Sequence, residues 1–371
     1  MNVRSLNNKN RRSIADAIFN SPRGVGVCWI VLIVSCLLGK AVYSTESTTR
    51  TRNTTKMKHV HTIKPKSTVI GNTELFYKFP NGICKGILIF FHGCNHGGQD
   101  AFYLPEDRLV LKAALERGLA VVSISSTNRK SGCWSKTEDL ADLGKVFDIW
   151  LKKVHLLKSL PRIGMGASSG GGILFSAYKI LKFKALASYI MWKSYSKDDL
   201  QHPDTLPATA FVYMGRDKRS HILPTFSEAL LKKGVASKVW QVEPHPLTVE
   251  LCTQRIPELG EERCHGILET ARLNHADLIG EDYTILEPYN KGYGAWYSFF
   301  NEESHLEQKR SKKKKKTERG KLSDVSFDGH SWLWASMVEE IAVSYGMHEM
   351  TADYRHEVLD WLMVEAGIDL D

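Results

Sequence analysis

Short apolar runs recur at intervals along the middle of the chain. Strands are expected in six segments, 86–91, 119–124, 160–165, 183–191, 208–214 and 237–242, of which 86–91 is apolar without interruption. Continuous apolar runs of this length are typical of parallel strands that are covered on both faces of a sheet. The pattern therefore predicts a sheet whose strands lie largely in the protein interior.

The stretches between these runs have helical rather than strand periodicity. In 138–156, for example, Leu143, Val146, Phe147 and Trp150 recur at helical spacing. Further helices are expected at 107–118, 173–181 and 223–234. Alternating strands and helices predict an α/β fold with a mostly parallel central sheet and helices on both faces.

The alternation stops after the last apolar run. Residues 246–329 contain one expected helix, at 263–276, and an aromatic-rich stretch from Tyr283 to Phe300. Two more helices follow, at 331–344 and near the C-terminus. An insert of this size predicts a cap or lid before the final helices. Its aromatic side chains can form a small cap core or a wall that faces the substrate.

The N-terminal part of the chain differs from the rest. A basic tail, 1–23, precedes an apolar span, 24–43, in which Lys40 is the one charged residue. About 20 such residues can cross a bilayer if the lysine reaches the headgroups. We expect a membrane anchor; a cleavable signal peptide and a buried core helix are the alternatives.

Residues 44–64 read as a flexible stem that contains the glycosylation sequon Asn53-Thr54-Thr55. The favoured topology is type II, with a short cytosolic tail and a globular domain in the lumen or outside the cell. Secretion after cleavage of a signal peptide is the alternative.

The net charge of +9 over 371 residues comes largely from one segment, 309–321, which holds nine basic residues and one acid. The rest of the chain is nearly neutral, so we expect no nucleic-acid partner. We read the lysine-rich segment as a solvated loop. A nuclear-import signal or a patch for anionic lipid is the alternative reading.

Seven cysteines are too few for a disulfide framework in a chain of this size. Cys28 and Cys36 lie in the apolar span, and bridges such as Cys252–Cys264 are possible in an oxidising compartment. No spacing of Cys and His suggests zinc. Asn95 and His96 could ligate a metal, but no third ligand follows at a suitable spacing, so no metal is expected.

The segment Gly166-Ala167-Ser168-Ser169-Gly170 has the form G-x-S-x-G. An expected strand precedes it and an expected helix follows it, which is the order that a nucleophile elbow requires. In such an elbow a strained turn presents the serine hydroxyl beyond the sheet. The sequence therefore predicts Ser168 as a nucleophile; an ordinary Gly/Ser-rich turn is the alternative.

A nucleophilic serine needs an oriented base and N–H donors for the oxyanion. By position the donors are the backbone N–H groups of Cys94, in the turn after strand 86–91, and of Ser169. Asp217 follows strand 208–214 in Gly215-Arg216-Asp217, where the acid of such a site belongs. The alternatives are a Gly-rich loop without a catalytic role and an aspartate that only forms a turn.

Three histidines are candidates for the base. His348 directly precedes the final helix, His330 opens the helix at 331–344, and His245 follows the last strand between two prolines. We favour His348 and keep His330 and His245 as alternatives.

With these residues in place, the chain resembles the α/β-hydrolase superfamily over residues 65–365. It is similar to eukaryotic membrane-anchored serine hydrolases with a His-Gly-Cys-Asn-His-Gly-Gly turn, here 92–98, a Cys133-Trp134 pair and a His348-Glu349 pair. The resemblance implies an α/β-hydrolase fold and favours His348. It also implies that Cys94 and Cys133 lie near the mouth of an active site.

The sequence thus predicts a membrane-tethered serine hydrolase that cleaves an ester, thioester or amide through an acyl-enzyme. Ser168 attacks, His348 transfers the proton and Asp217 orients the histidine. No metal or organic cofactor is required. A non-catalytic binding module on the same fold and an acyltransferase are the competing hypotheses.

Overall fold

The computed structural model describes residues 63–156, 158–274, 277–286 and 331–370. All of them belong to the second of two compact units, 58–371. The predicted basic tail, apolar span, Asn53, lysine-rich segment and His330 lie outside the described residues. Within the described ranges, no helix combines the length and the apolar character that crossing a membrane needs.

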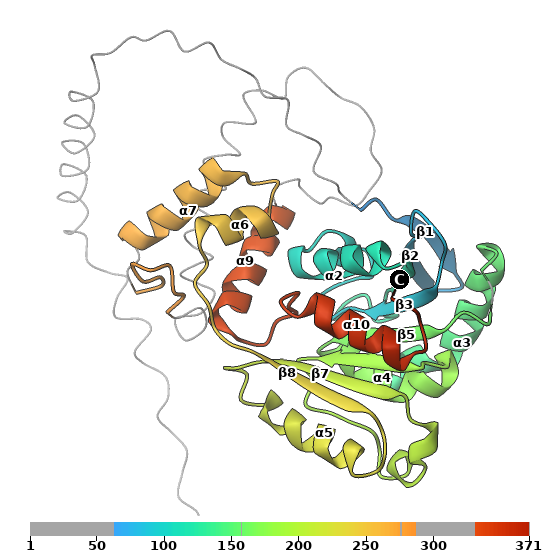
Figure 1. The fold of residues 1–371 in the computed structure, drawn as a ribbon. Helices are drawn as coiled ribbons and strands as arrows, with labels where there is room; N and C mark the ends of the chain where they lie inside the picture. The colour runs from blue at the N-terminus through green and yellow to red at the C-terminus, as the bar shows by residue number, and fades with distance from the viewer. Residues whose placement is uncertain (1–62, 157, 275–276, 287–330, 371) are drawn as a thin grey trace, which may run out of the picture. The chain divides into compact units, whose positions relative to one another are not determined.

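A single eight-stranded sheet organises this unit (Figure 1). The strands lie side by side in the order β1-β2-β4-β3-β5-β6-β7-β8. Strand β2 runs antiparallel to both of its neighbours, and β4 to β8 are parallel to one another and to β3. The strand bounds are β1 Lys66–Ile70, β2 Thr73–Lys78, β3 Gly86–Phe91, β4 Leu119–Ile124, β5 Arg162–Ala167, β6 Ala185–Tyr189, β7 Ala208–Met214 and β8 Ser237–Val242.

The predicted runs at 86–91, 119–124, 208–214 and 237–242 are strands with the expected bounds. Strand β5 begins two residues later than predicted, at Arg162, and β6 is shorter than the run at 183–191. The parallel sheet with buried central strands is therefore confirmed, whereas β8, at the edge of the sheet, is only partly buried.

The sequence analysis missed the first two strands. They form a hairpin at the edge of the sheet, joined through Gly71, whose φ is 60°. In β2 buried positions alternate with partly buried ones, and β1 has one buried position, so neither strand is a continuous apolar run. A strand near the edge of a sheet, with one face exposed to solvent, has a weaker hydrophobic pattern in its sequence than a central strand has.

Helices cover both faces of the sheet (Figure 1). Helices α2 (Pro105–Glu116) and α10 (Arg355–Glu365) contribute to one core, around the side chains of Phe90 and Met165. Helices α3 (Lys136–Lys153), α4 (Ser169–Leu181) and α5 (Leu223–Leu231) contribute to the other. The helices expected at 107–118, 138–156, 173–181 and 223–234 are all present, with shifted ends.

Three helices beyond β8 form a small third core (Figure 1). They are α6 (Val249–Arg255), which the sequence analysis missed, α7 (Glu261–Asn274) and α9 (Ser331–Tyr345). A disulfide between Cys252 and Cys264 joins α6 to α7. Met337 and Ile341 of α9 pack into the same cluster, so the cap core includes a helix that follows the predicted insert at 246–329.

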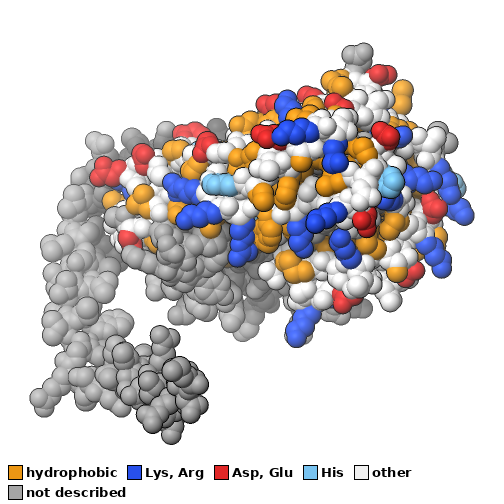
Figure 2. All heavy atoms as spheres, turned by 90° about the horizontal axis from the view of Figure 1, so that it is seen from below, with side chains coloured by type: hydrophobic (Ala, Val, Ile, Leu, Met, Phe, Trp, Pro, Cys, Tyr) orange, Lys and Arg blue, Asp and Glu red, His pale blue; other side chains and the backbone are white. Residues whose placement is uncertain are grey.

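Lys and Arg side chains lie dispersed among hydrophobic and acidic ones over the face of the molecule in Figure 2. On this face the basic groups do not form one continuous patch.

Candidate active site

Ser168 occupies the turn between β5 and α4. Its backbone has φ 51° and ψ −117°, a conformation that side-chain-bearing residues rarely adopt. The Ser168 N–H donates to Tyr189 O at 3.0 Å, and its carbonyl accepts from Gly172 N at 2.9 Å. These bonds hold the strained turn, as a nucleophile elbow requires.

The glycines on either side of Ser168 allow the elbow to form. A Cβ on Gly170 would lie 2.1 Å from Phe91 O, and one on Gly166 would lie 2.6 Å from the Gly170 carbonyl carbon. Neither distance is possible without moving backbone. The two glycines therefore let α4 begin directly against β5 and the end of β3.

The structure brings Ser168, His348 and Asp217 into one hydrogen-bonded chain. His348 Nε2 lies 3.0 Å from Ser168 Oγ, and His348 Nδ1 lies 2.7 Å from Asp217 Oδ2. With its proton on Nδ1, the imidazole donates to the carboxylate and accepts from the serine hydroxyl. This arrangement can activate a hydroxyl as a nucleophile.

Asp217 lies just past the end of β7 and is 5 % exposed. Its carboxylate also accepts hydrogen bonds from Ser220 Oγ at 2.7 Å and from Arg219 N at 3.2 Å. Burial favours the neutral acid, but the hydrogen bonds from His348 and Ser220 outweigh it and lower the pKa of Asp217. The carboxylate is therefore charged at neutral pH and can stabilise an imidazolium.

The loop that carries His348 is fixed on two sides. Gly346, with φ 81°, ends α9 and accepts a hydrogen bond from Arg216 N at 2.9 Å. The Trp192 ring lies 5.7 Å from the imidazole, centroid to centroid. The loops after β7 and α9 are thus tied together beside the residues that they present.

Cys94 and Ser169, the expected oxyanion donors, lie in segments beside Ser168. Cys94 follows β3, lines the cavity at Ser168 and forms a disulfide with Cys133. Ser169 is the first residue of α4, and its hydroxyl accepts from Trp134 N at 3.3 Å. The Cys133-Trp134 pair therefore contacts both segments and fixes their spacing.

His92 has a structural environment. Its Nδ1 donates to Gly93 O at 2.7 Å, and its Nε2 accepts from Ser126 N at 3.1 Å. Burial lowers the pKa of His92 to about 4, so the ring is neutral at physiological pH. It holds the turn after β3 to the turn after β4.

A cavity of about 450 Å³ opens at Ser168 and His348. Part of its wall is apolar, from Leu104, Ala167, Ile190, Val338 and Met350. The polar part includes three acidic side chains and a histidine, namely Asp107, Glu339, Glu349 and His96.

The acids in this wall have raised pKa values. Burial raises the pKa of Asp107 to about 7. Burial also raises the pKa values of Glu339 and Glu349, and neighbouring carboxylates add to the rise for Glu339. The pKa of His96 is raised as well: burial opposes its charged form, but the Asp100 hydrogen bond and the charges of Glu349 and Asp107 outweigh burial.

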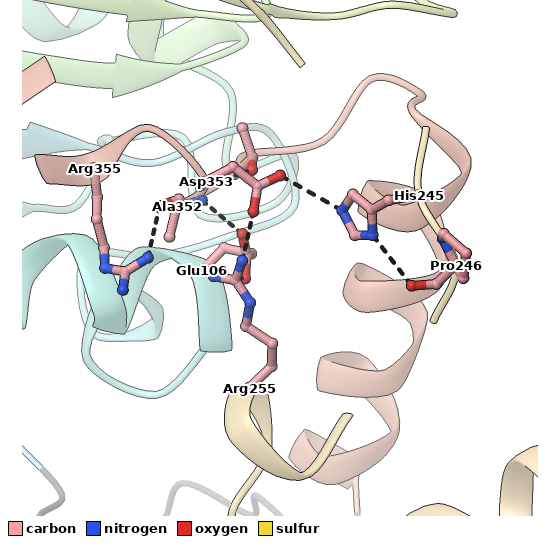
Figure 3. Close-up of polar contacts among 8 residues, drawn as sticks. Glu106, His245, Pro246, Arg255, Ala352, Asp353 and Arg355 are labelled. Atoms are coloured by element: carbon pink, nitrogen blue, oxygen red, sulfur yellow. Dashed lines mark hydrogen bonds and ion pairs between the residues drawn. The ribbon is translucent and has the colours of Figure 1, made fainter. Parts of the chain in front are cut away.

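Of the two alternative candidates for the base, His330 and His245, the structure describes only His245. His330 lies outside the described residues. His245 makes its side-chain contacts with Asp353, at 3.5 Å, and with Pro246 O (Figure 3). In the same figure Arg255 from α6 lies between the carboxylates of Glu106 and Asp353. His245 therefore belongs to the network that joins the cap to the core.

Sequence reasoning missed several residues of the site. Ser220 binds Asp217, and Trp192 packs on His348, although nothing in their local sequence signals it. Asp107 and Glu339 were also not predicted as residues of the site. Asp107 had a usable signal, because it lies in an amphipathic helix next to Glu106, and both side chains turn out to be buried.

The strand order, the antiparallel second strand and the elbow after β5 define the α/β-hydrolase fold, which confirms the fold class. No family model matches the sequence, and no curated protein matches it.

Several solved hydrolase structures are similar to the chain. A CIB-like hydrolase from Thermoplasma acidophilum is 16% identical over 56% of this chain and 97% of its own, with a TM-score of 0.37. Thermogutta terrifontis esterase 2, phosphorylated by paraoxon, is 13% identical over 49% and 83%, also at 0.37. An esterase from Pyrococcus furiosus is 17% identical over 56% and 91%, again at 0.37. Likenesses at this level carry no argument about activity, and the fold assignment rests on the topology.

Proposed function

We propose that this protein is a serine hydrolase that cleaves an ester, thioester or amide through an acyl-enzyme. The observation that carries the proposal is the continuous hydrogen-bonded chain from Ser168 through His348 to Asp217. A non-catalytic binding module has no need of a strained serine aligned with a histidine and a buried carboxylate. The assembled site therefore favours an enzyme.

In the first half-reaction, Ser168 Oγ attacks the carbonyl carbon while its proton passes to His348 Nε2. The N–H groups of Cys94 and Ser169 stabilise the oxyanion that forms. The bond to the leaving group then breaks, and His348 returns the proton to the departing alcohol, thiol or amine. Asp217 keeps the imidazole oriented and stabilises its charged form.

In the second half-reaction, water attacks the acyl group on Ser168 while His348 Nε2 takes one of its protons. The bond between the acyl carbon and Ser168 Oγ breaks, and the proton passes to the serine. The products are a carboxylic acid and the restored hydroxyl. Transfer to an alcohol or amine in place of water would make the protein an acyltransferase, and product analysis with added alcohol distinguishes the two.

A fluorophosphonate probe tests the proposal. The wild-type protein should be labelled, and Ser168→Ala should abolish labelling. Ser176→Ala, which changes a serine two turns further along α4, is the matched control and should label normally. Absence of labelling in folded wild-type protein would overturn the assignment of Ser168 as a nucleophile.

We also propose that the enzyme is a type II membrane protein with its hydrolase domain on the lumenal or extracellular side. Two disulfides, Cys94–Cys133 and Cys252–Cys264, support an oxidising compartment. The apolar span 24–43 supplies the tether, and Asn53 would carry a glycan on the same side. Expression in cells should give an endoglycosidase-sensitive form that Asn53→Gln removes; an insensitive wild type with a cytosolic domain would contradict this topology.

A further inference from the structure

The cavity at Ser168 has an excess of acidic groups on its wall. Asp107 comes from α2, Glu339 from α9, and Glu349 from the residue after His348. Three separate segments therefore place a carboxyl group around one space of about 450 Å³. A substrate of Ser168 must occupy this space, because Ser168 and His348 line it too.

Two of these carboxyl groups are incompletely partnered. Asp107 is 6 % exposed and Glu339 is 5 % exposed. Among the residues that the structure describes, Asp107 Oδ1 and Glu339 Oε2 accept no hydrogen bond. Buried oxygen atoms of this kind normally have a donor, so their position in a cavity wall points to a group that enters the cavity.

The neighbouring acid Glu106 is a buried carboxylate with a structural role, and its partners can be compared with those of Asp107. Glu106 is fully buried, pairs with the Arg255 guanidinium at 3.0 Å, and accepts from Ala352 N at 2.6 Å. Asp107, the next residue on the same helix, lines the cavity instead, and no guanidinium of the described residues pairs with it. The difference points to a cation that enters the cavity with a bound molecule.

Among the described residues of the cavity wall, the basic side chains are His96 and His348. His348 is already hydrogen-bonded to Asp217, and His96 lies 3.7 Å from Asp100. One histidine with its own acidic neighbour cannot neutralise three carboxyl groups. The described part of the cavity therefore has more acidic than basic groups. Burial raises the pKa values of these acids, and a cation that enters the cavity would lower them again by stabilising the carboxylate forms.

We infer that the substrate carries a guanidinium or primary ammonium group that binds between Asp107, Glu339 and Glu349. This inference rests on the proposed function, since it names the substrate class of the same site. Carboxylate oxygens without donors select a cation that has N–H groups, and guanidinium offers several in one plane. In the described ranges, no group of three or more His, Cys, Asp and Glu side chains could hold a metal ion.

A pair of matched substrates tests the inference. A p-nitrophenyl ester of a guanidinoalkanoate and one of the ureidoalkanoate of equal length differ in charge and hardly in shape. A second pair, a guanidinoalkyl and a ureidoalkyl acetate, places the group on the alcohol. In one pair or the other, kcat/KM should be about tenfold to a hundredfold higher for the cation, as expected of hydrogen bonds to charged groups.

The variant Glu339→Gln should lower this preference about tenfold or more. Glu349→Gln provides a second, independent variant should the first fail to fold. Glu262→Gln, an exposed acid on α7, is the matched control and should keep the full preference. A trimethylammonioalkanoate ester, which is cationic but lacks N–H donors, should be hydrolysed more slowly than the guanidino ester.

Labelling of Ser168 by the fluorophosphonate distinguishes a failure of the cationic substrate from a failure of the proposed hydrolase activity. A protein that labels but shows equal rates for both members of both pairs overturns the cationic substrate and leaves the hydrolase proposal standing. A preference for the cation that neither glutamate variant changes overturns the binding site at Asp107, Glu339 and Glu349. An equal rate for the trimethylammonio and guanidino esters overturns the selection for N–H donors. A folded protein that does not label overturns the hydrolase itself.

Discussion

At the scale of single residues, the site depends on three side chains that are 49 or more positions apart in the sequence. Ser168 is presented by a strained backbone, Asp217 by the end of a buried strand, and His348 by a loop after a helix. Each local pattern was visible in the sequence. Their contact, with distances of 3.0 and 2.7 Å, is a property of the folded chain.

The first prediction concerns His348 as the catalytic base. His348→Ala should lower kcat/KM by about 10³-fold or more, because Ser168 then loses its proton acceptor. His245→Ala should retain most of the activity, because His245 contacts Asp353 and Pro246. Ester hydrolysis by the two purified variants decides this, and the reverse order of activities would make His245 the base.

The second prediction follows from the lowered pKa of Asp217 and concerns how stability depends on pH. A carboxylate whose pKa falls on folding stabilises the folded state above its unfolded pKa, about 4, and loses that contribution as the pH falls through its folded pKa. Asp217→Asn should therefore melt below the wild type at pH 7, and the gap in Tm should close in acid. A gap that persists unchanged below the folded pKa of Asp217 would mean that its charge contributes nothing.

At the scale of elements, close contacts between backbones decide where the site forms. Helix α4 can start immediately after Ser168 only because Gly170 lies against the end of β3. The loop after α9 likewise reaches the sheet through the hydrogen bond from Arg216 N to Gly346 O. The helices and strands therefore act as rigid supports whose ends meet at one edge of the sheet.

Gly170→Ala tests this close approach. The new methyl would meet Phe91 O at 2.1 Å and His92 O at 2.4 Å, so backbone must move. We expect a loss of roughly 3 kcal/mol or more in the free energy of unfolding, or failure to fold. Gly266→Ala, on α7 with open space around it, is the control and should be neutral or stabilise by about 1 kcal/mol. Urea unfolding measures both, and equal effects would contradict the steric argument.

At the scale of the whole described unit, the cap helices are joined to the core around the sheet by charge as well as by apolar packing. Arg255 on α6 binds Glu106 on α2 and Asp353 before α10 (Figure 3). Burial works against the guanidinium, but Glu106, Glu340 and Asp353 raise the pKa of Arg255 and keep it charged. One arginine thus connects the cap to two segments of the core.

Replacing this arginine should be costly. Arg255→Met leaves buried acids without their cation, and we expect a loss of about 3–5 kcal/mol in the free energy of unfolding. Arg263→Met, an exposed arginine on α7, should change it by less than about 0.5 kcal/mol. Chemical denaturation compares the two variants, and a small effect of Arg255→Met would show that packing alone joins cap and core.

The sequence by itself determined the sheet of buried parallel strands, the elbow at Ser168 and the acid position at Asp217. These features are local, because each depends on a run of neighbouring residues. Tertiary structure decided what depends on distant contacts: that His348 rather than His245 reaches Ser168, that Cys94 pairs with Cys133, and that Asp107, Glu339 and Glu349 share one cavity. No periodicity reports which loops meet in space, since that follows from the order and packing of all the strands and helices together.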